Sequence, residues 1–335
     1  MLSTMDATLE YYNNHSYTYP WLPNDGIDHD KISEDISSHN ISYYGNFYTN
    51  TQIAVDIFTS VICFIGMVGN GIVVWLLGFC IKKNHFTIYI LNLAVADFGL
   101  LFSLIFVIVS EWLIVLHDFT TVFSLVSLFP FLSMHSASQF LLTVISIERC
   151  VAAFFPLWHQ CHQQPHLSTI ICVLVWALSF LLSATTCSMI EINPNESMVD
   201  LFYQFIVNAV LCLPLVMIST VALFVKVCFK VQHHQKGKLL TIILLTLLFF
   251  LLLVFPLNII YILYIYNYVP SYVPAFATVL SCINSSVNPV IYFLVGRQWK
   301  TRHRETMKMI FQRVFKEEEC CTEELETQVE LETQT

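Results

Sequence analysis

The chain has 335 residues, of which 56% are hydrophobic and only 12% are charged, and its formal net charge is −9. This apolar surface exceeds what one soluble core can bury, so the composition excludes a soluble globular protein and indicates a membrane protein. The negative charge lies in the N-terminal segment and in the C-terminal tail, and no nucleic-acid partner is implied.

Residues 1–51 precede the first long apolar stretch. They lack the basic and apolar regions of a cleaved signal peptide, and they contain no cysteine. We therefore expect an extracellular, disordered N-terminal segment, because no disulfide framework holds it together. Asn14 and Asn40 begin glycosylation triplets in this segment, and Asn195 begins another in a later connection. Because such triplets also occur by chance, an unmodified asparagine is the alternative at each site.

Seven apolar stretches follow, and each is near or above the roughly 20 residues that a helix needs to cross a bilayer. They cover approximately residues 54–80, 87–110, 122–149, 167–189, 201–229, 239–264 and 273–295. The connections between them are short. The sequence therefore predicts an all-α membrane protein whose residues 52–296 form a seven-transmembrane helix bundle.

The positive charges indicate how this bundle is oriented. Of the 15 lysines and arginines, Lys31 alone lies in the N-terminal segment. The others occupy alternate connections and the tail: Lys82, Lys83, Arg149, Lys226, Lys230, Lys236, Lys238, Arg297, Lys300, Arg302, Arg304, Lys308, Arg313 and Lys316. Because basic residues are retained on the cytoplasmic side, we expect an extracellular N-terminus and a cytoplasmic C-terminus.

A few polar residues lie at membrane depth in spans one, two, three and seven, where each must find a hydrogen-bond partner. They are Asn70, Asp97, Ser138, Asn284, Ser285 and Asn288. We predict that they form a buried cluster that holds water and a small cation such as Na+, with Asp97 supplying the charge. The alternative is a protonated, hydrogen-bonded Asp97 without an ion. No other cofactor is expected.

The third apolar stretch ends in a charged pair, Glu148 and Arg149. Charge at a membrane edge is costly and is usually retained for function. A seam at helical spacing, through positions 131, 135, 139, 142 and 146, leads along this span to Arg149. Phe131 and His135 begin the seam and are candidates for a ligand pocket. For His135, the alternative is a structural residue that is simply hydrogen-bonded.

Acidic residues gather near the predicted outer face, at Glu111, Asp118, Glu191, Glu196 and Asp200. They should attract cations, so Glu111 and Asp200 join the candidates for the ligand pocket. The alternative is a solvated acidic rim without a ligand. Because no metal-ligand or nucleophile–base constellation appears at membrane depth, no enzyme is predicted.

Residues 297–316 combine basic side chains with Trp299, Ile310 and Phe311, which is typical of a short amphipathic helix on the inner leaflet. Residues 317–335 form an acidic cytoplasmic tail. Cys320 and Cys321 follow the amphipathic segment and are candidates for palmitoylation. Two exposed thiols are the alternative reading.

The end of the seventh stretch, Asn288-Pro289-Val290-Ile291-Tyr292, resembles the NPxxY motif of rhodopsin-like G-protein-coupled receptors. Further matches lie in the expected spans, at Gly69-Asn70, Leu93 to Asp97, Glu148-Arg149-Cys150 and Trp176. Longer strings, from Gly69 to Leu77, Phe86 to Ala94 and Asn284 to Gly296, resemble the Mas-related G-protein-coupled receptors. The similarity covers about residues 55–315.

This resemblance implies a plasma-membrane receptor with a short eighth helix that couples an extracellular ligand to a heterotrimeric G protein, of the Gq/11 or Gi class. Arg149 would pair with Glu148 at rest and would meet the Gα subunit after helix six moves. Asn288, Pro289 and Tyr292 would support that rearrangement. Such receptors often take basic peptides or amphiphilic cations, and arrestin is a further expected partner.

Departures from the pattern also carry predictions. The usual bridge position, 25 residues before Arg149, is Ser124, and Ile190 and Met198 stand where Mas-related receptors place their cysteines, so no disulfide is expected. Thr186 stands where these receptors place an acid, which weakens the case for a strongly basic ligand. Helix six offers no acid to Arg149, so we expect a weakly held resting state and detectable basal signalling.

Two other classes of membrane protein, a secondary transporter and a non-signalling scaffold, fit the sequence less well than a receptor. A secondary transporter would favour repeated halves and several membrane carboxylates. A non-signalling scaffold would not need Glu148 and Arg149 together with the motif from Asn288 to Tyr292.

Overall fold

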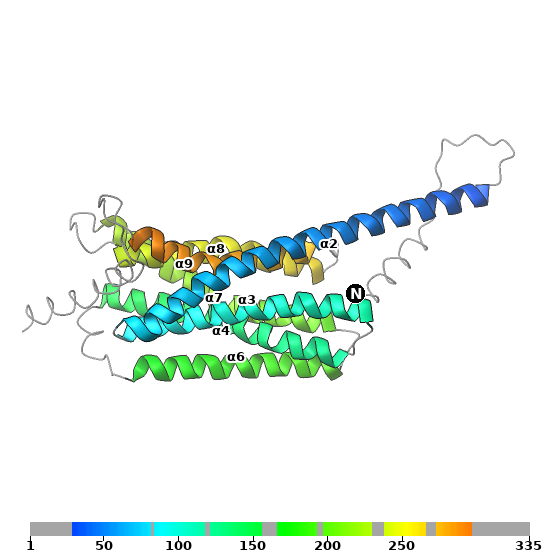
Figure 1. The fold of residues 1–335 in the computed structure, drawn as a ribbon. Coiled ribbons are helices and arrows are strands. Elements are labelled where there is room, and N and C mark those ends of the chain that lie inside the picture. Colours follow the sequence, from blue (N-terminus) through cyan, green and yellow to red (C-terminus); the bar gives the residue numbers. More distant parts are fainter. Residues whose placement is uncertain are drawn as a thin grey trace, which may run out of the picture.

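The computed structural model describes residues 29–81, 84–117, 121–155, 166–192, 197–229, 238–265 and 273–296. All regular structure in these ranges is helical, and the helices lie alongside one another as a bundle (Figure 1). The elements are α2 (His29–Trp75), the short π-helix η1 (Leu76–Cys80), α3 (His85–His117), α4 (Thr121–Phe154), α6 (Leu167–Ile192), α7 (Ser197–Phe229), α8 (Lys238–Ile265) and α9 (Val273–Gly296). The predicted seven-helix fold is confirmed.

Among the residues whose side chains are described, five helices contain segments that are long and apolar enough to cross a membrane: Gln52–Cys80, His85–Ser110, Val126–Phe154, Leu167–Ile192 and Tyr203–Lys226. α8 and α9 contain shorter apolar segments, Ile243–Val254 and Thr278–Leu294. Large apolar side chains also face outward along these helices, including Leu174, Leu181 and Ile218. Lipid solvates such side chains as well as a protein core does, so outward-facing apolar residues are expected of a membrane bundle.

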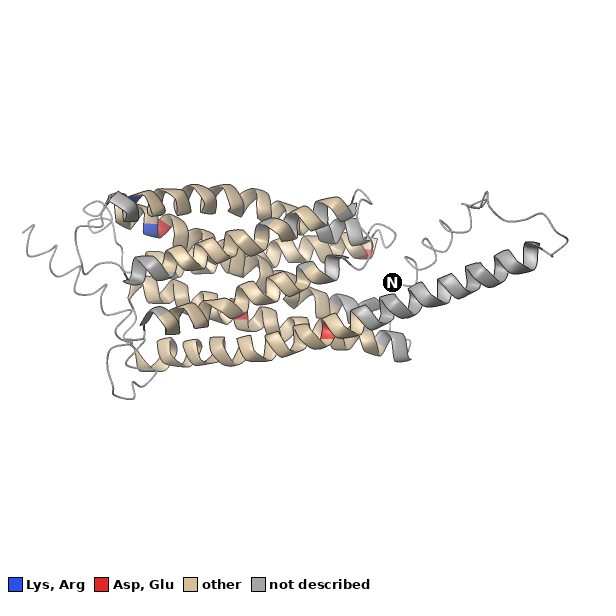
Figure 2. Cartoon of the chain, turned by 90° about the horizontal axis from the view of Figure 1, so that it is seen from above, with Lys and Arg blue, Asp and Glu red and all other residues tan. Residues whose placement is uncertain are grey.

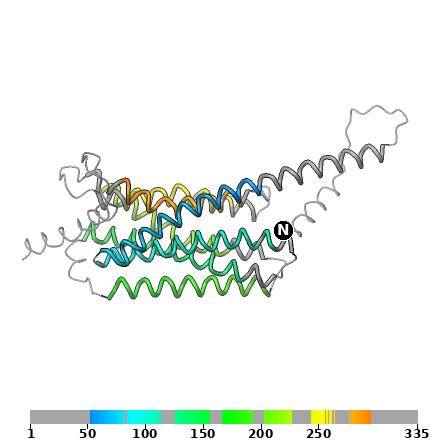
Figure 3. Tube along the Cα trace, viewed as in Figure 1, coloured from blue at the N-terminus to red at the C-terminus, as the bar shows by residue number. Residues whose placement is uncertain are grey.

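α4 is the central helix, since it packs against α3, α6, α7 and α8. α2 packs against α3 and α9, and α8 packs against α7 and α9, which closes the ring on the other side. The Cα trace in Figure 3 follows this arrangement. There α2 crosses α9, and α6 lies on the opposite side of α4 from α2. A side chain on α4 therefore reaches most other helices of the bundle.

α2 begins at His29, within the segment that we expected to lack stable structure. No proline lies between Pro23 and Pro130, so no residue in that interval removes a backbone donor from a growing helix. The apolar span begins only at Gln52, close to the predicted boundary. The helix thus continues past its membrane-spanning part, and Figure 1 shows it extending beyond the rest of the bundle.

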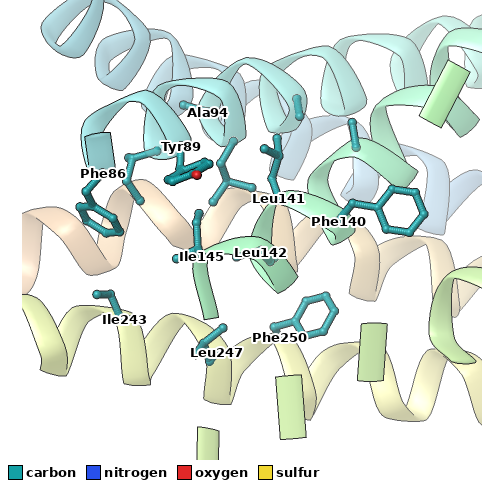
Figure 4. Packing of buried hydrophobic residues seen from close by; sticks show 14 of the residues in the cluster. Phe86, Tyr89, Ala94, Phe140, Leu141, Leu142, Ile145, Ile243, Leu247 and Phe250 are labelled. Atoms are coloured by element: carbon teal, nitrogen blue, oxygen red, sulfur yellow. The ribbon is translucent and has the colours of Figure 1, made fainter. Parts of the chain in front are cut away.

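Buried apolar residues form two clusters. The larger joins α3, α4 and α8 through side chains such as Tyr89, Leu141 and Phe250, and Figure 4 shows them converging between these helices. The smaller gathers residues such as Leu101, Phe131 and Phe205. α4 also carries buried polar residues, such as His135 and Ser138. This helix therefore presents both apolar and polar groups to its neighbours.

Candidate functional site

Charged side chains are rare in the bundle and are unevenly placed. Where side chains are described, they are Asp56, Asp97, Glu148, Arg149, Glu191 and Lys226. Figure 2 shows the basic groups at one end of the bundle, and acidic groups at that end, in the middle and toward the other end. We call the end where α4 terminates the Arg149 end, and the opposite end, where α2 enters its apolar span, the Asp56 end.

Asp97 of α3 is fully buried, with 0% of its surface exposed. Ser138 Oγ of α4 donates a hydrogen bond to Asp97 Oδ1 at 2.6 Å, and Asn288 Nδ2 of α9 donates to Asp97 Oδ2 at 2.8 Å. Both donors are uncharged, and each comes from a different helix. The carboxylate therefore joins three helices by hydrogen bonds that strengthen in a low dielectric.

A second asparagine joins α2 to α9. Asn70 Nδ2 donates to Gly66 O on its own helix and to Ser285 O on α9, both at 3.0 Å. The six residues predicted to cluster thus include two hydrogen-bonded groups, Asp97 with Ser138 and Asn288, and Asn70 with the Ser285 carbonyl. We call these five residues the Asp97 cluster. Asn284 is buried one turn before Asn288 on α9, but it forms none of these bonds.

The Asp97 cluster has a donor set suited to a small hard cation. It offers carboxylate, hydroxyl and amide oxygens, which are the ligands that such cations prefer. The Ser285 hydroxyl is buried and lies near the Asp97 carboxylate, but it makes no hydrogen bond within 3.5 Å to a described residue. Its oxygen is therefore placed where it can contact an ion or a water held at Asp97. The residues present therefore fit the predicted Na+.

Arg149 lies near the C-terminal end of α4. Its Nη2 and Nε donate to the two carboxylate oxygens of Glu148, at 2.7 and 2.9 Å. The Arg149 side chain is 9% exposed and the Glu148 side chain 15%. The Cζ atom also lies 3.9 Å from the centroid of the Phe86 ring on α3. The predicted pair is thus formed, and it is bidentate and largely buried.

The remaining switch residues lie on α9. Pro289 packs closely against α2, since a Cβ atom at Gly69 would lie 3.1 Å from Pro289 Cβ. Tyr292 is buried in the same apolar cluster as Phe86 and Tyr89. Asn288 connects this segment to Asp97, as described above. The motif from Asn288 to Tyr292 therefore touches both the Asp97 cluster and the apolar cluster beside Arg149.

The predicted pocket residues Phe131 and His135 are both buried. His135 Nε2 lies 2.7 Å from Gln139 Nε2, and His135 Nδ1 lies 3.2 Å from Ser281 Oγ of α9. The imidazole also meets the Phe205 ring edge to face at 4.8 Å. These contacts favour the alternative reading of His135, a hydrogen-bonded residue that ties α4 to α9.

Sequence reasoning missed a polar group between α4, α6 and α7. Gln204 Nε2 donates to Ser136 Oγ and Ser183 Oγ, both at 3.0 Å, and Asn208 Nδ2 donates to Ser136 Oγ at 2.8 Å. Gln204 and Asn208 are spaced by four in an otherwise apolar stretch, which places them on one helix face. That spacing was the available signal.

Asp56 is a second omission. Trp112 Nε1 of α3 donates to Asp56 Oδ2 at 3.1 Å, and Gln52 Nε2 donates to Asp56 Oδ1 at 2.9 Å. The carboxylate lies at the start of the first span and not in a connection, so it is not among the acids predicted for the outer face. It is a half-buried acid whose hydrogen-bond donors here carry no charge.

Several predicted residues lie outside the described part of the chain. They are Asn14, Asn195, Cys320 and Cys321, with the segments 297–316 and 317–335. Asn40, Glu111 and Asp200 lie in helices, but their side chains are not described. The cysteines that the structure describes, including Cys187, are all free.

Comparisons with known proteins bear on this arrangement. The chain is 34% identical to proto-oncogene Mas of Mus musculus over 267 residues, which cover 76% of this chain and 81% of that protein. It is 36% identical to Mas-related G-protein coupled receptor member H of Rattus norvegicus, over 80% of this chain and 84% of that protein. It is 31% identical to Mas-related G-protein coupled receptor member X1 of Homo sapiens, over 79% of this chain and 84% of that protein. The family model described as 7 transmembrane receptor (rhodopsin family) matches residues 69–292.

The chain belongs to the rhodopsin family of seven-transmembrane receptors, in its Mas-related group. It is therefore a G-protein-coupled receptor and a multi-pass protein of the plasma membrane, and it is not an enzyme. The matched range begins at Gly69 and ends at Tyr292, so it contains both the Asp97 cluster and the pair of Glu148 and Arg149. The resemblance drawn from the sequence motifs is confirmed.

Proposed function

We propose that this receptor binds a cationic extracellular ligand and activates a G protein of the Gq/11 or Gi class through Arg149. The observation that carries the proposal is the bidentate, largely buried pair of Glu148 and Arg149 at one end of α4. The same helix carries Ser138, which binds Asp97. A displacement of α4 relative to α3 and α9 therefore acts on both sites.

In this proposal the Arg149 end faces the cytoplasm. Lys226 lies at that end of α7, and the remaining basic residues fall almost entirely in the connections and tail that follow from the same end. Positive residues are retained on the cytoplasmic side during membrane insertion. The N-terminus is then extracellular.

Activation exchanges the partner of Arg149. At rest the guanidinium is held by Glu148, and when the Arg149 end of α8 moves outward, it meets the C-terminal helix of the Gα subunit. An agonist favours that state only by the difference in its affinity for the two states. Asn288 and Tyr292 connect the change to α9, because Asn288 is hydrogen-bonded to Asp97 and Tyr292 belongs to the same apolar cluster as Phe86.

A cationic ligand is supported by the acids toward the Asp56 end. Asp56 is half-buried and is held by two uncharged donors, Trp112 and Gln52, so these bonds leave its negative charge in place. Glu191 is exposed at the end of α6. Carboxylates in a partly apolar setting attract amines and guanidinium groups more strongly than they do in water.

A sodium ion at Asp97 belongs to the same proposal. Asp97, Ser138, Ser285 and Asn288 would hold it, and the ion would supply the positive charge that favours an ionised Asp97. If so, Na+ raises the melting temperature of the purified wild-type receptor above its value in N-methylglucamine, whereas Asp97→Asn shows no difference between the two salts. Equal melting temperatures of the wild type in both salts would contradict the ion.

Four further expectations are carried by the sequence alone. They are glycosylation at Asn14, Asn40 and Asn195, palmitoylation at Cys320 and Cys321, an amphipathic helix over residues 297–316, and arrestin as a partner of the tail.

The direct test compares wild type, Arg149→Ala and a control, Lys226→Ala, at matched surface expression. Calcium and cyclic-nucleotide responses are recorded while cells receive basic peptides or amphiphilic amines. We expect the wild type and the control to respond, and Arg149→Ala to lose the response. An antibody to an N-terminal tag on intact cells reports orientation and expression together. A full response from Arg149→Ala would overturn the assigned role.

A further inference from the structure

Phe86, a side chain from another helix, meets the Arg149 guanidinium. It is 1% exposed and lies in the first turn of α3, at the edge of the larger apolar cluster (Figure 4). Arg149 Cζ lies 3.9 Å from its ring centroid, well within the range in which a cation is attracted by an aromatic face. The contact joins α4 to α3 at the position that the G protein must reach.

The chain around Phe86 holds this ring in place. Asn84 caps α3 reciprocally with Thr87: Thr87 N donates to Asn84 Oδ1, and Asn84 N donates to Thr87 Oγ1, both at 2.8 Å. Such a capping arrangement fixes the backbone of the first turn. His85 Nδ1 also lies 3.0 Å from Ser168 Oγ of α6. The residue before Phe86 and the residue after it are thus both anchored.

Glu148 and Phe86 differ in what they can restrain at Arg149. Glu148 is its neighbour on α4, so this ion pair travels with the helix and does not by itself oppose a movement of α4. Phe86 belongs to α3, and the contact with its ring is lost when Arg149 moves away from that helix. A buried ring face attracts a guanidinium more strongly than an exposed one, because little water competes.

We propose that Phe86 is a resting-state clamp: its ring holds the Arg149 guanidinium against α3 and so lowers basal activation of the G protein. This inference rests on the proposed function, in which Arg149 leaves that position to meet Gα. Helix six has no acid that could hold Arg149 at rest, and this proposal gives that role to the face of an aromatic ring. Phe86 is a positioning residue and contacts no ligand in this proposal.

The test weakens the ring's attraction for a cation without changing the shape of the side chain. Mono-, di- and trifluorophenylalanine at position 86 progressively withdraw electron density from the ring face. Nucleotide exchange is measured on purified G proteins of the Gq and Gi classes with the receptor in lipid and no ligand. We expect basal exchange to rise stepwise with fluorine number, by roughly tenfold for the trifluoro ring, which corresponds to about 1.4 kcal/mol.

Phe140 provides the matched control, since it is buried on α4 in the same apolar cluster. The same fluorinated series at position 140 should leave basal exchange unchanged. A purely packing role for Phe86 predicts no gradient with fluorine number, and a flat series at position 86 would overturn the clamp. Phe86→Leu, which removes the ring and keeps an apolar side chain, should match the trifluoro variant.

A signalling-independent measurement separates failure of the clamp from failure of the proposed function. In the purified receptor, the fluorine resonance of monofluoro-Phe86 should shift on Arg149→Gln, and that of monofluoro-Phe140 should not. No shift at position 86 overturns the clamp, whatever the signalling results show. A shift at position 86 combined with equal exchange by wild type and Arg149→Ala supports the contact and overturns the role of Arg149 in coupling.

Discussion

α4 takes part in two sites that contain an acid, and the two sites are held in opposite ways. Asp97 receives hydrogen bonds from Ser138 on α4 and from Asn288 on α9, so this buried carboxyl group in the middle of the bundle ties separate helices together. Arg149 is paired with its neighbour in the chain, and another helix meets it through the face of an aromatic ring. The middle of the bundle is therefore suited to act as a fixed point, and the Arg149 end is suited to move.

The largest effect is expected from removing the fixed point. Asp97→Ala leaves Ser138 Oγ and Asn288 Nδ2 without their acceptor in a buried site. Hydrogen bonds to a charged group contribute about 1.5–3 kcal/mol each, so we expect a loss of about 3–5 kcal/mol in the free energy of unfolding. Thermal unfolding of the purified receptor measures it. Ser138→Ala, which removes one donor, should cost about half as much. Equal melting temperatures of Asp97→Ala and wild type would show that the Asp97 site does not fix the bundle.

A smaller effect is expected where α2 meets α9 beside Asn70. A Cβ atom at Gly66 would lie 2.7 Å from Leu101 Cδ1 and 2.9 Å from Ser286 Cβ, closer than such atoms pack. Gly66→Ala should therefore destabilise the receptor by about 1–3 kcal/mol through overpacking. Gly71 on the same helix is the control, because a Cβ there meets its nearest neighbour at 3.7 Å, an ordinary contact. Equal thermal stability of the two variants would show that the α2–α9 contact gives way easily.

The Asp97 cluster was predictable because hydrocarbon offers no hydrogen-bond partners. Polar residues in separate apolar spans must then find partners. Asp97 bonds to Ser138 and Asn288, and Asn70 bonds to the Ser285 carbonyl. The same reasoning could not say which oxygen each donor takes, nor that Asn284 would stay outside the network. Those details depend on the rotation of each helix, which side-chain spacing constrains only to within a face.

The contact of Phe86 with Arg149 lay beyond sequence reasoning for a different reason. Residue type alone does not predict that an apolar ring and a charged side chain will be in contact, and the two positions are 63 residues apart. The pairing of Glu148 with Arg149 was expected from the receptor resemblance. Likewise, His135 was read in two ways from its place on the seam, and its hydrogen bonds to Gln139 and Ser281 required the packed structure.

Glu148→Gln tests the mobile side of the comparison. The change removes the negative charge that neutralises Arg149 but leaves an amide of the same shape. The pair is largely buried, but it lies on one helix, and the glutamine amide oxygen can still accept a hydrogen bond from Arg149, so we expect the free energy of unfolding to fall by only about 1 kcal/mol. Basal nucleotide exchange should rise several-fold, since in the proposed function the guanidinium must leave Glu148 to meet Gα, a step separate from the movement of α4. A loss of stability as large as that of Asp97→Ala would show that both sites fix the bundle.

The smallest effect is expected at Lys226, which provides a second cation–aromatic contact at the same end. Its Nζ lies 4.8 Å from the Phe154 ring centroid, but Phe154 is 45% exposed, whereas Phe86 is 1% exposed. Lys226→Met keeps the apolar stem and removes the ammonium, so the cost in unfolding free energy should be about 0.5 kcal/mol. Basal nucleotide exchange should not change, because this contact does not involve Arg149. If Lys226→Met raised basal exchange as Phe86→Leu is expected to, the Arg149 end would respond to any lost charge there, and burial of the ring would not explain the clamp.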